Sequence, residues 1–410
     1  MRVIDDLRSG TPLTLERMRL WAVVLLAAYS ASFVFLLAGA HGLNDFEGRP
    51  LGSDYADIYV AGLEANAGHA AEIYSPAAHH AAEQAVFGEK TPFYGWHYPP
   101  FFLLIAAPLA RLPYFASLLV WQAATLGLYL LASAALLRRS GVTNRSWILY
   151  ALAFPGVFAT LLAGHNGFLT AALLTGALAF LDEAPLLAGI LFGLLAYKPQ
   201  FGLMIPLVLL ATGRWRTIAS ATLTVAALVA LCTVAFGFDI WPAFAASGKF
   251  TRTFVLEEGR TGFYRIQSVF AWVRMWGGSI GLAYLLQGGM TAGCAASLYR
   301  LWRTPVPQDI KNAMLCIAAI LATPYSLDYD LMALAPAIGL LFADGMTHGF
   351  RPYQKTIAAA LWLSPLLART IPALTHVPVT IPILLAGFVL TLRYATPEVR
   401  ANARTSLASA

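Results

Sequence analysis

The chain has 410 residues, of which 59% are hydrophobic and only 12% are charged, and its formal net charge is +6. Soluble domains contain about 25% charged residues, so this composition excludes an ordinary water-soluble enzyme and a disordered chain. The three cysteines are scattered in apolar runs and predict neither a disulfide framework nor a zinc site. In a membrane protein a basic excess marks cytoplasmic loops, so we expect no nucleic-acid partner.

The first long apolar run covers residues 21–40 and is long enough to cross the hydrocarbon core. Arg2, Arg8, Arg17 and Arg19 precede it. The run is longer than the apolar region of a signal peptide, which is about 7–15 residues. We therefore predict a retained membrane span with a cytoplasmic N-terminus.

Further apolar stretches follow along the chain, and they predict an all-α polytopic membrane protein with about 12 transmembrane helices in a single domain, residues 1–410. Several stretches are short, because a helix of about 13 residues covers only about 20 Å, so they must extend into their flanks or lie in a thinned bilayer. The stretches lie near 114–137, 146–163, 167–181, 185–197, 200–212, 217–236, 277–299, 310–323, 329–345, 357–371 and 377–393.

Residues 98–112 decide the topology, because they are apolar but short and rich in proline. If they cross the membrane, the arginine clusters of the later loops lie outside; if they re-enter or lie in the interface, these clusters lie inside. The positive-inside rule favours the second arrangement, with both termini and the tail 394–410 cytoplasmic. The extracytoplasmic face of the plasma membrane then receives the first loop (41–113), the second loop (237–276) and the junctions 164–167, 197–200 and 323–330.

The first loop contains two alanine-rich stretches, 54–68 and 76–87, which predict helices lying at the bilayer interface. We interpret most of its acidic residues, Glu83 among them, as belonging to solvated helix faces. Asp54 differs, because it follows Gly52-Ser53 and begins the helical pattern. Its carboxylate is either a helix N-cap or a functional group.

The short junctions carry unusual polar residues. The sequence Gly164-His165-Asn166-Gly167 predicts a tight turn, with His165 and Asn166 either solvated or functional. Lys198 lies between two apolar spans, where it either snorkels to the surface or meets an anion such as a phosphate. Asp328 and Asp330 begin a span, where the helix dipole favours carboxylates.

The second loop interleaves basic and aromatic residues, a pattern that suits either an anionic lipid head group or an aromatic belt with snorkelling bases. Its basic residues are Lys249, Arg252, Arg260, Arg265 and Arg274. The chain contains no Walker A, H-E-x-x-H or G-x-S-x-G motif. A soluble nucleotide-sugar or ATP site is therefore unsupported, we expect no cofactor, and a donor substrate would arrive through the membrane.

A series of motifs resembles one known family. They are S-D-Y…Y-V-A-G-L, H-Y-P-P-F, A-P-L-A-R-L-P-Y with a following W-Q, G-H-N-G-F-L-T-A, L-A-G-I-L-F-G-L-L-A-Y-K-P-Q, G-R-W-R, I-Q-S-V-F and T-P-Y-S-L-D-Y-D. In number and order, over residues 50–345, they resemble glycosyltransferase family 87, polyprenyl-phosphate-mannose-dependent α-1,2-mannosyltransferase-like proteins of the GT-C superfamily. The resemblance implies a GT-C-like helical bundle and transfer of a sugar, mannose in the characterised members, from a polyprenyl-phosphate donor to a lipid-linked or glycan acceptor of the cell envelope.

The resemblance also implies roles for individual residues. An acid of the first loop serves as general base in this family, and Asp54 matches it best, with Asp57 as the alternative. Transfer from a β-linked donor to an α product is inverting and needs one base. We expect the donor phosphate to bind Lys198, Arg252, Arg260 and Arg265. We expect sugar or acceptor contacts from Tyr59, His97, Tyr98, His165, Asn166, Gln200, Gln267, Tyr325, Asp328 and Asp330.

No metal is required by this chemistry, although Asp328 and Asp330 are residues that could hold one. Some relatives carry histidines where this chain has Tyr329 and Asp330, which leaves the role of the two aspartates open. The alternative function is a lipid or solute transporter or flippase without transferase activity. Transporters place polar groups near the bilayer midplane, whereas here they gather at one boundary, which favours a transferase. A donor carrying another sugar remains open.

Overall fold

The computed structural model describes residues 2–395, and this part of the chain is helical, with isolated β-bridges in place of strands. The predicted tail lies outside the described residues from residue 396 onward. The α-helices are α1 (Arg2–Ser9), α2 (Leu15–Ala38), α3 (Ser53–Asn66), α4 (Pro76–Phe87), α5 (Leu103–Leu109), α6 (Tyr114–Arg139), α7 (Trp147–Leu152), α8 (Pro155–Ala163), α9 (Gly167–Phe180), α10 (Pro185–Leu194), α11 (Ile205–Ala211), α12 (Trp215–Phe236), α13 (Ile240–Thr251), α14 (Val269–Met275), α15 (Ile280–Trp302), α16 (Gln308–Leu321), α17 (Ala335–His348), α18 (Gln354–Leu367), α19 (Thr370–Thr375) and α20 (Thr380–Tyr394). Short 3₁₀ or π segments are η1 (Glu72–Tyr74), η2 (Pro100–Phe102), η3 (Leu195–Tyr197), η4 (Pro199–Gly202), η5 (Arg252–Glu257), η6 (Phe263–Arg265) and η7 (Asp328–Leu334).

The all-α prediction is confirmed, but the count of about 12 transmembrane helices is not. Within the described residues, four helical segments are long and apolar enough to cross a membrane: Leu15–Ala38, Tyr114–Arg139, Trp215–Phe236 and Asp328–His348. Most of the other predicted spans are helical but shorter or interrupted, as at Pro155 and Pro199, because proline removes a backbone donor and disfavours a helix at the residue before it. Helix α15 has 23 residues and is long enough, but it is not among the four segments that are also apolar enough.

Residues 98–112 form η2 and α5, which together run from Pro100 to Leu109. At 1.5 Å per residue this segment is about 15 Å long, about half of the hydrocarbon thickness. It is therefore too short to cross a membrane alone, and it packs against α3 instead.

Two helices form the centre of the bundle. In α9, 13 of 14 residues are buried, and in α16, 12 of 14. Helices α6, α10 and η7 pack around α9. By contrast, α2 and α12 have mostly exposed apolar side chains, which is expected of helices that face lipid rather than water.

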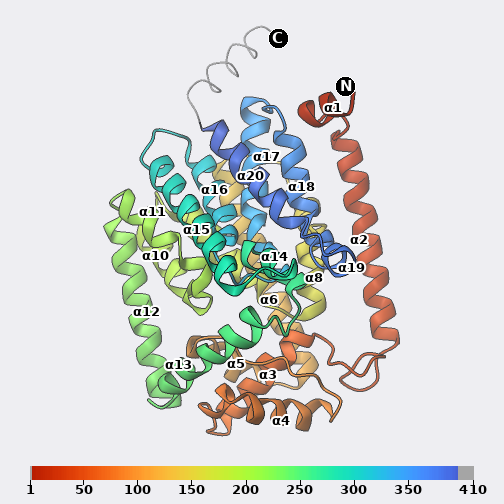
Figure 1. Ribbon diagram of the computed structural model, residues 1–410, viewed down its shortest axis with the longest axis vertical. Helices are drawn as coiled ribbons and strands as arrows, with labels where there is room; N and C mark the ends of the chain where they lie inside the picture. The colour runs from red at the N-terminus through yellow and green to blue at the C-terminus, as the bar shows by residue number, and fades with distance from the viewer. Residues whose placement is uncertain (1, 396–410) are drawn as a thin grey trace.

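The inter-helix junctions fall into two groups at opposite ends of the bundle. Figure 1 shows α2 running along one side, from the end that holds α1 to the end that holds α3, α4, α5 and α13. The α1 end is rich in ion pairs, and the amide of Tyr353 donates to the carbonyl of Arg8 there (2.7 Å). These pairs are Arg139–Glu183 (2.5 Å), Arg214–Asp182 (2.7 Å) and Arg351–Asp344. The arginine clusters of the short loops were also predicted from the sequence to lie on one side of the membrane.

Two glycines bring the start of α3 against the turn between α8 and α9. Gly52 precedes α3 with φ 71°, and Gly164 ends α8 with φ 66°. A Cβ on Gly164 would lie 2.5 Å from the Cβ of Tyr55 and 3.4 Å from the Cα of Gly52. Only glycine fits both the left-handed conformation and this close approach. The approach sets Asp54 near the His165 turn.

Helix α3 packs closely against α5. Seven of its 14 residues are buried, and its Gly62 lies directly on α5. A Cβ at Gly62 would lie 2.3 Å from the carbonyl oxygen of Ala106. The amide of Asn66 also donates to the carbonyl of Ala107 (2.8 Å). Helix α3 is therefore half-buried against the bundle, and its position at the bilayer interface stays a prediction.

This contact predicts opposite effects for two glycine substitutions. Gly62→Ala should destabilise the protein by about 1–3 kcal/mol, because the added methyl group overpacks the α3–α5 contact. Gly127→Ala is the matched control, since Gly127 lies inside α6 with nothing within 4 Å of its Cβ position, and alanine is the better helix former. Thermal unfolding in detergent should show a lower midpoint for Gly62→Ala and an unchanged or higher one for Gly127→Ala. Equal midpoints would contradict the tight packing of α3 on α5.

Candidate functional site

Asp54 lies in the first turn of α3, one residue inside the helix. The N-cap position belongs to Gly52, and the helix begins at Ser53. The hydroxyl of Ser53 donates to Oδ1 of Asp54 (3.3 Å). The Asp54 side chain is therefore not the helix N-cap that its sequence position allowed, and it is partly exposed.

The surroundings of Asp54 weaken it as an acid. Burial raises the pKa of Asp54 to about 6, against the lowering effect of the Arg265 guanidinium, and the nearby carboxylates of Asp328 and Asp57 raise it further. A carboxylate whose pKa is near 6 is mostly ionised at pH 7, yet it accepts a proton more readily than an ordinary aspartate. These are the properties of a general base.

The 164–167 turn stacks against η7 and the segment before α5. The ring of His165 stacks on that of Tyr329, with centroids 3.5 Å apart, and its Nε2 lies 3.3 Å from the hydroxyl of Tyr98. Burial lowers the pKa of His165 well below its usual value, and the charges of Lys198 and Arg265 lower it further. The imidazole is therefore neutral at pH 7 and suited to hydrogen bonding.

Asn166, the next residue, is fully buried. Neither its amide nitrogen nor its amide oxygen has a hydrogen-bond partner within residues 2–395. Because buried polar groups are nearly always hydrogen-bonded, this side chain is poised for a ligand or a water molecule.

Lys198 is buried, and its ammonium group is paired. Its Nζ lies 2.5 Å from Oδ1 of Asp330, and Oδ2 of Asp330 accepts a hydrogen bond from the amide of Leu327 (2.9 Å). The pair joins the 197–200 junction to η7. Asp328, two residues earlier, lies 4.0 Å from Nε of Arg369. The positive charge of Lys198 is thus balanced in place before any ligand binds.

Part of the second loop is tied to η7 by backbone contacts. Ile266 forms an isolated bridge with Leu327, and the amide of Gln267 donates to the carbonyl of Ser326 (2.6 Å). This attachment brings Arg265 into the electrostatic field of Asp54 and Asp328, which raises the pKa of Arg265 although its burial opposes this. Arg265 is therefore the second-loop arginine whose charge faces Asp54.

The other two second-loop arginines predicted to bind phosphate pair with acids of the same loop. Arg252 pairs with Glu257 (3.3 Å) and Arg260 with Glu258 (2.8 Å), and both arginine side chains are 64% exposed. The sequence alone did not distinguish the three arginines.

Some predicted sugar-binding residues have local structural partners. The hydroxyl of Tyr59 donates to the carbonyl of Leu112 (3.0 Å), and the buried amide of Gln267 donates to the carbonyl of Ala368 (3.1 Å). Tyr325 packs against the apolar cluster around Val255. Gln200 lies half-buried in η4.

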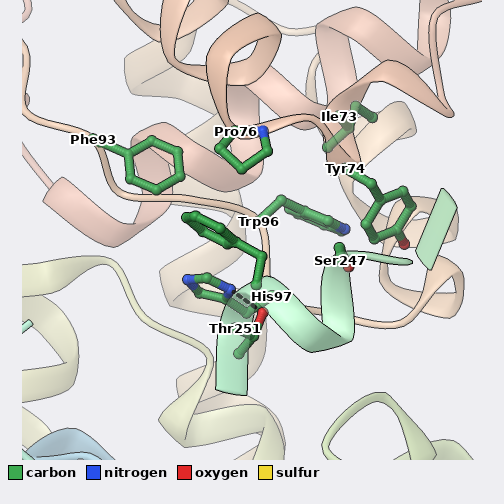
Figure 2. Close-up of a pocket in the computed structure, with 9 residues that line it drawn as sticks. Ile73, Tyr74, Pro76, Phe93, Trp96, His97, Ser247 and Thr251 are labelled. Atoms are coloured by element: carbon green, nitrogen blue, oxygen red, sulfur yellow. Dashed lines mark hydrogen bonds between the residues drawn. The ribbon is translucent and has the colours of Figure 1, made fainter. Parts of the chain in front are cut away.

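His97 lines a small pocket between the first loop and α13. Figure 2 shows its Nδ1 next to the hydroxyl of Thr251, and the two atoms are 2.9 Å apart. Trp96 and Phe93 line the same pocket, whose volume of about 10 Å³ is about that of one water molecule. A sugar does not fit there.

Three features of this region were not predicted from the sequence. Tyr329 contributes the ring that stacks on His165, and Arg369 approaches Asp328. The third feature is a buried cluster in which His79 lies between Asp57 and Glu83. The interpretation of Glu83 as part of a solvated face is wrong, because its side chain is fully buried. The four-residue spacing of His79 and Glu83, which places both on one helix face, was the available signal.

Comparison with known proteins decides the family. The sequence model of glycosyltransferase family 87 matches residues 96–324, which is more than half of the chain. The chain belongs to glycosyltransferase family 87. This family 87 protein is therefore a glycosyltransferase, and its long apolar helices make it a membrane one. No curated protein and no solved structure matches it. Family membership supports the transferase over the transporter alternative.

The matched region of this family 87 protein includes Tyr98, His165, Lys198 and Arg265, whereas Asp54 lies before it. The family match therefore does not include Asp54, and its assignment to the site depends on the close approach of α3 to the 164–167 turn.

The Lys198–Asp330 pair predicts strong coupling between two substitutions. Lys198→Met or Asp330→Asn alone should lower the free energy of unfolding by about 3–5 kcal/mol, because each leaves a buried charge without its partner. The double variant removes both charges and should recover most of this loss. Denaturant unfolding of the four proteins in detergent measures the coupling. If the loss in the double variant equals the sum of the two single losses, Lys198 and Asp330 do not stabilise the protein as an ion pair.

Proposed function

We propose that this family 87 protein transfers a sugar, with mannose the expected one, from a polyprenyl-phosphate donor to a lipid-linked or glycan acceptor, with inversion at the anomeric carbon. The observation that carries the proposal is the half-buried Asp54, with a pKa raised to about 6, in the field of an arginine and beside a neutral histidine turn. The family match supports sugar transfer, and the apolar composition suits substrates anchored in lipid.

In the proposed reaction, Asp54 is the general base. The acceptor hydroxyl oxygen attacks the anomeric carbon, the bond from that carbon to the phosphate oxygen breaks, and the hydroxyl proton passes to the Asp54 carboxylate. The leaving group is a phosphate monoester of low pKa, so it departs without a general acid. Asp57 is less suited to this role, because it is 4% exposed and its Oδ1 lies 2.7 Å from His79 Nε2.

Arg265 is the best-placed of the four proposed phosphate ligands. Its guanidinium is partly buried, its Nε has no hydrogen-bond partner within the described range, and the acids beside it are Asp54 and Asp328. A guanidinium binds phosphate through two parallel hydrogen bonds and would stabilise the charge that grows on the leaving group. Lys198 supports the same region through its pair with Asp330.

Tyr98, His165 and Asn166 are the proposed sugar-hydroxyl partners. The hydroxyl of Tyr98 and the neutral ring of His165 already approach each other at 3.3 Å. Asn166 adds an unpaired donor and an unpaired acceptor. A site with such groups discriminates strongly against analogues that lack the matching hydroxyl, because its polar atoms are then left unpaired.

We propose that the site faces the extracytoplasmic side of the plasma membrane and that both termini are cytoplasmic. Helix α2 has 24 residues, which span about 36 Å, and it separates the arginine-rich N-terminal end from the end that holds α3 (Figure 1). The positive-inside rule assigns the arginine-rich end to the cytoplasm. In this arrangement the shorter apolar helices combine with their flanks to give the proposed bundle of about 12 crossings.

Replacing Asp54 tests the function and the base together. Asp54→Asn should lower the rate of sugar transfer by about 100- to 10,000-fold, while the exposed Asp239→Asn should transfer at the wild-type rate. The measurement uses membranes with radiolabelled polyprenyl-phosphate mannose and native lipid acceptors, with equal amounts of folded protein.

Full activity of Asp54→Asn would move the base to Asp57 or to the Asp328–Asp330 segment. Transfer from another polyprenyl-phosphate sugar, but not from mannose, would change the donor and keep the mechanism. An inactive wild type with every polyprenyl-linked sugar would contradict the proposal.

The raised pKa of Asp54 predicts the pH dependence of transfer. A general base works when it is deprotonated, so kcat/KM should rise about tenfold per pH unit below about pH 6 and level off above it. Arg265→Gln removes a charge that lowers the pKa of Asp54, so its inflection should move to higher pH even if its rate is lower. A profile that is flat through pH 6 would show that Asp54 does not limit the reaction.

A further inference from the structure

Three buried side chains from α3 and α4 converge behind the candidate site. Asp57 lies on α3, and His79 and Glu83 lie one turn apart on α4. Nε2 of His79 is 2.7 Å from Oδ1 of Asp57 and 3.8 Å from Oε1 of Glu83. None of the three residues is more than 4% exposed. Both helices lie at the end of the bundle opposite α1 (Figure 1).

The charges of this cluster do not balance. It contains two carboxylates and one imidazole, and neither carboxylate pairs with a lysine or arginine within the described residues. Even a protonated His79 leaves one negative charge in a buried position, which is strongly unfavourable. A cation or an additional proton must therefore neutralise the cluster.

The geometry of the unpaired atoms favours a bound cation over an additional proton. Oε1 of Glu83 is fully buried and has no hydrogen-bond partner in the part of the chain that the structure describes. It points toward His79, from which it is too distant for a hydrogen bond. A bound metal with ligands at 2.0–2.2 Å separates neighbouring ligand atoms by about 2.8–3.6 Å, for ligand–metal–ligand angles between about 90° and 110°. The two distances from Nε2 of His79, 2.7 and 3.8 Å, lie on either side of this range.

We propose that Asp57, His79 and Glu83 bind one divalent transition-metal cation, Zn²⁺ or Mn²⁺. One imidazole and two carboxylates form a ligand set that these ions accept, and a divalent cation balances both carboxylates while His79 stays neutral. From the sequence no metal was expected, and the only residues that could hold one were Asp328 and Asp330, which belong to another part of the site.

The bound ion would be a structural cross-link between α3 and α4. Asp57 follows Asp54 by three residues, so the two carboxylates lie on neighbouring positions of the same helix. Fixing Asp57 therefore fixes the start of α3, and the three ligands act as positioning residues for Asp54. The ion does not touch the substrate in this arrangement.

The test measures metal content and stability, and it needs no transfer assay, so its failure is distinct from a failure of the proposed function. The wild type, Glu83→Gln and the matched control Glu72→Gln, whose residue is exposed on the same loop, are purified without a histidine tag. Metal is measured by mass spectrometry. Thermal unfolding is followed with EDTA and after Zn²⁺ or Mn²⁺ is added back.

We expect about one metal ion per chain in the wild type and in Glu72→Gln, and at least a fivefold loss in Glu83→Gln. EDTA should lower the unfolding midpoint of the first two proteins only, and the added metal should restore it. Glutamine has the shape of a protonated glutamate, so Glu83→Gln should fold in either case. A metal-free wild type whose midpoint responds to neither EDTA nor metal would overturn the proposal, and so would equal metal content in all three proteins.

Discussion

The buried pair of Lys198 and Asp330 is the interaction on which the arrangement of the site depends. It joins two junctions that are 132 residues apart in the sequence, and Asp330 also holds the amide of Leu327. Leu327 in turn forms the bridge to Ile266. A single ion pair thus fixes η7 relative to the 197–200 junction and, through the backbone, fixes the position of Arg265. Burying both charges is tolerated because each compensates the other.

The second constraint is the contact between the two left-handed glycines. Gly52 and Gly164 let α3 approach the turn after α8, so a carboxylate from the first loop meets polar residues from the helical core. Interrupted helices serve the same purpose. Continuous apolar spans would place Asn166 and Lys198 inside hydrocarbon, where polar groups are costly. Breaks at the end of the bundle allow these side chains to lie within protein, where Lys198 pairs with Asp330 and Asn166 stays available for a ligand or a water molecule.

The sequence predicted which residues gather at the site better than it predicted which of their side chains are in contact. The positive-inside rule assigned Lys198, His165 and Asp330 to one face of the membrane. The side of each junction follows from the number of spans that precede it and from the positions of the basic loops. The pairing of Lys198 with Asp330 could not be predicted, since it depends on how distant helices pack. Glu83 was misinterpreted for the same reason. An alanine-rich amphipathic stretch does not reveal that its polar face packs against another buried acid. Three of the four second-loop arginines were predicted to bind phosphate, and the sequence did not show that the bridge of Ile266 to Leu327 brings only Arg265 of these three into the field of Asp54.

In the proposed reaction, Arg265 would connect the strength of the proposed base to the presence of the donor. In the free protein its guanidinium lowers the pKa of Asp54 and so weakens that carboxylate as a proton acceptor. A phosphate bound to Arg265 offsets part of this positive charge, because the field of the guanidinium is then shared between two anions. The pKa of Asp54 would rise as a result, and the proposed base would be stronger when the donor is in place. Lys198 cannot act in this way, since Asp330 already balances its charge. Lys198 is therefore a structural cation because it pairs with Asp330, whereas Arg265 can respond to the donor because the acid beside it is Asp54.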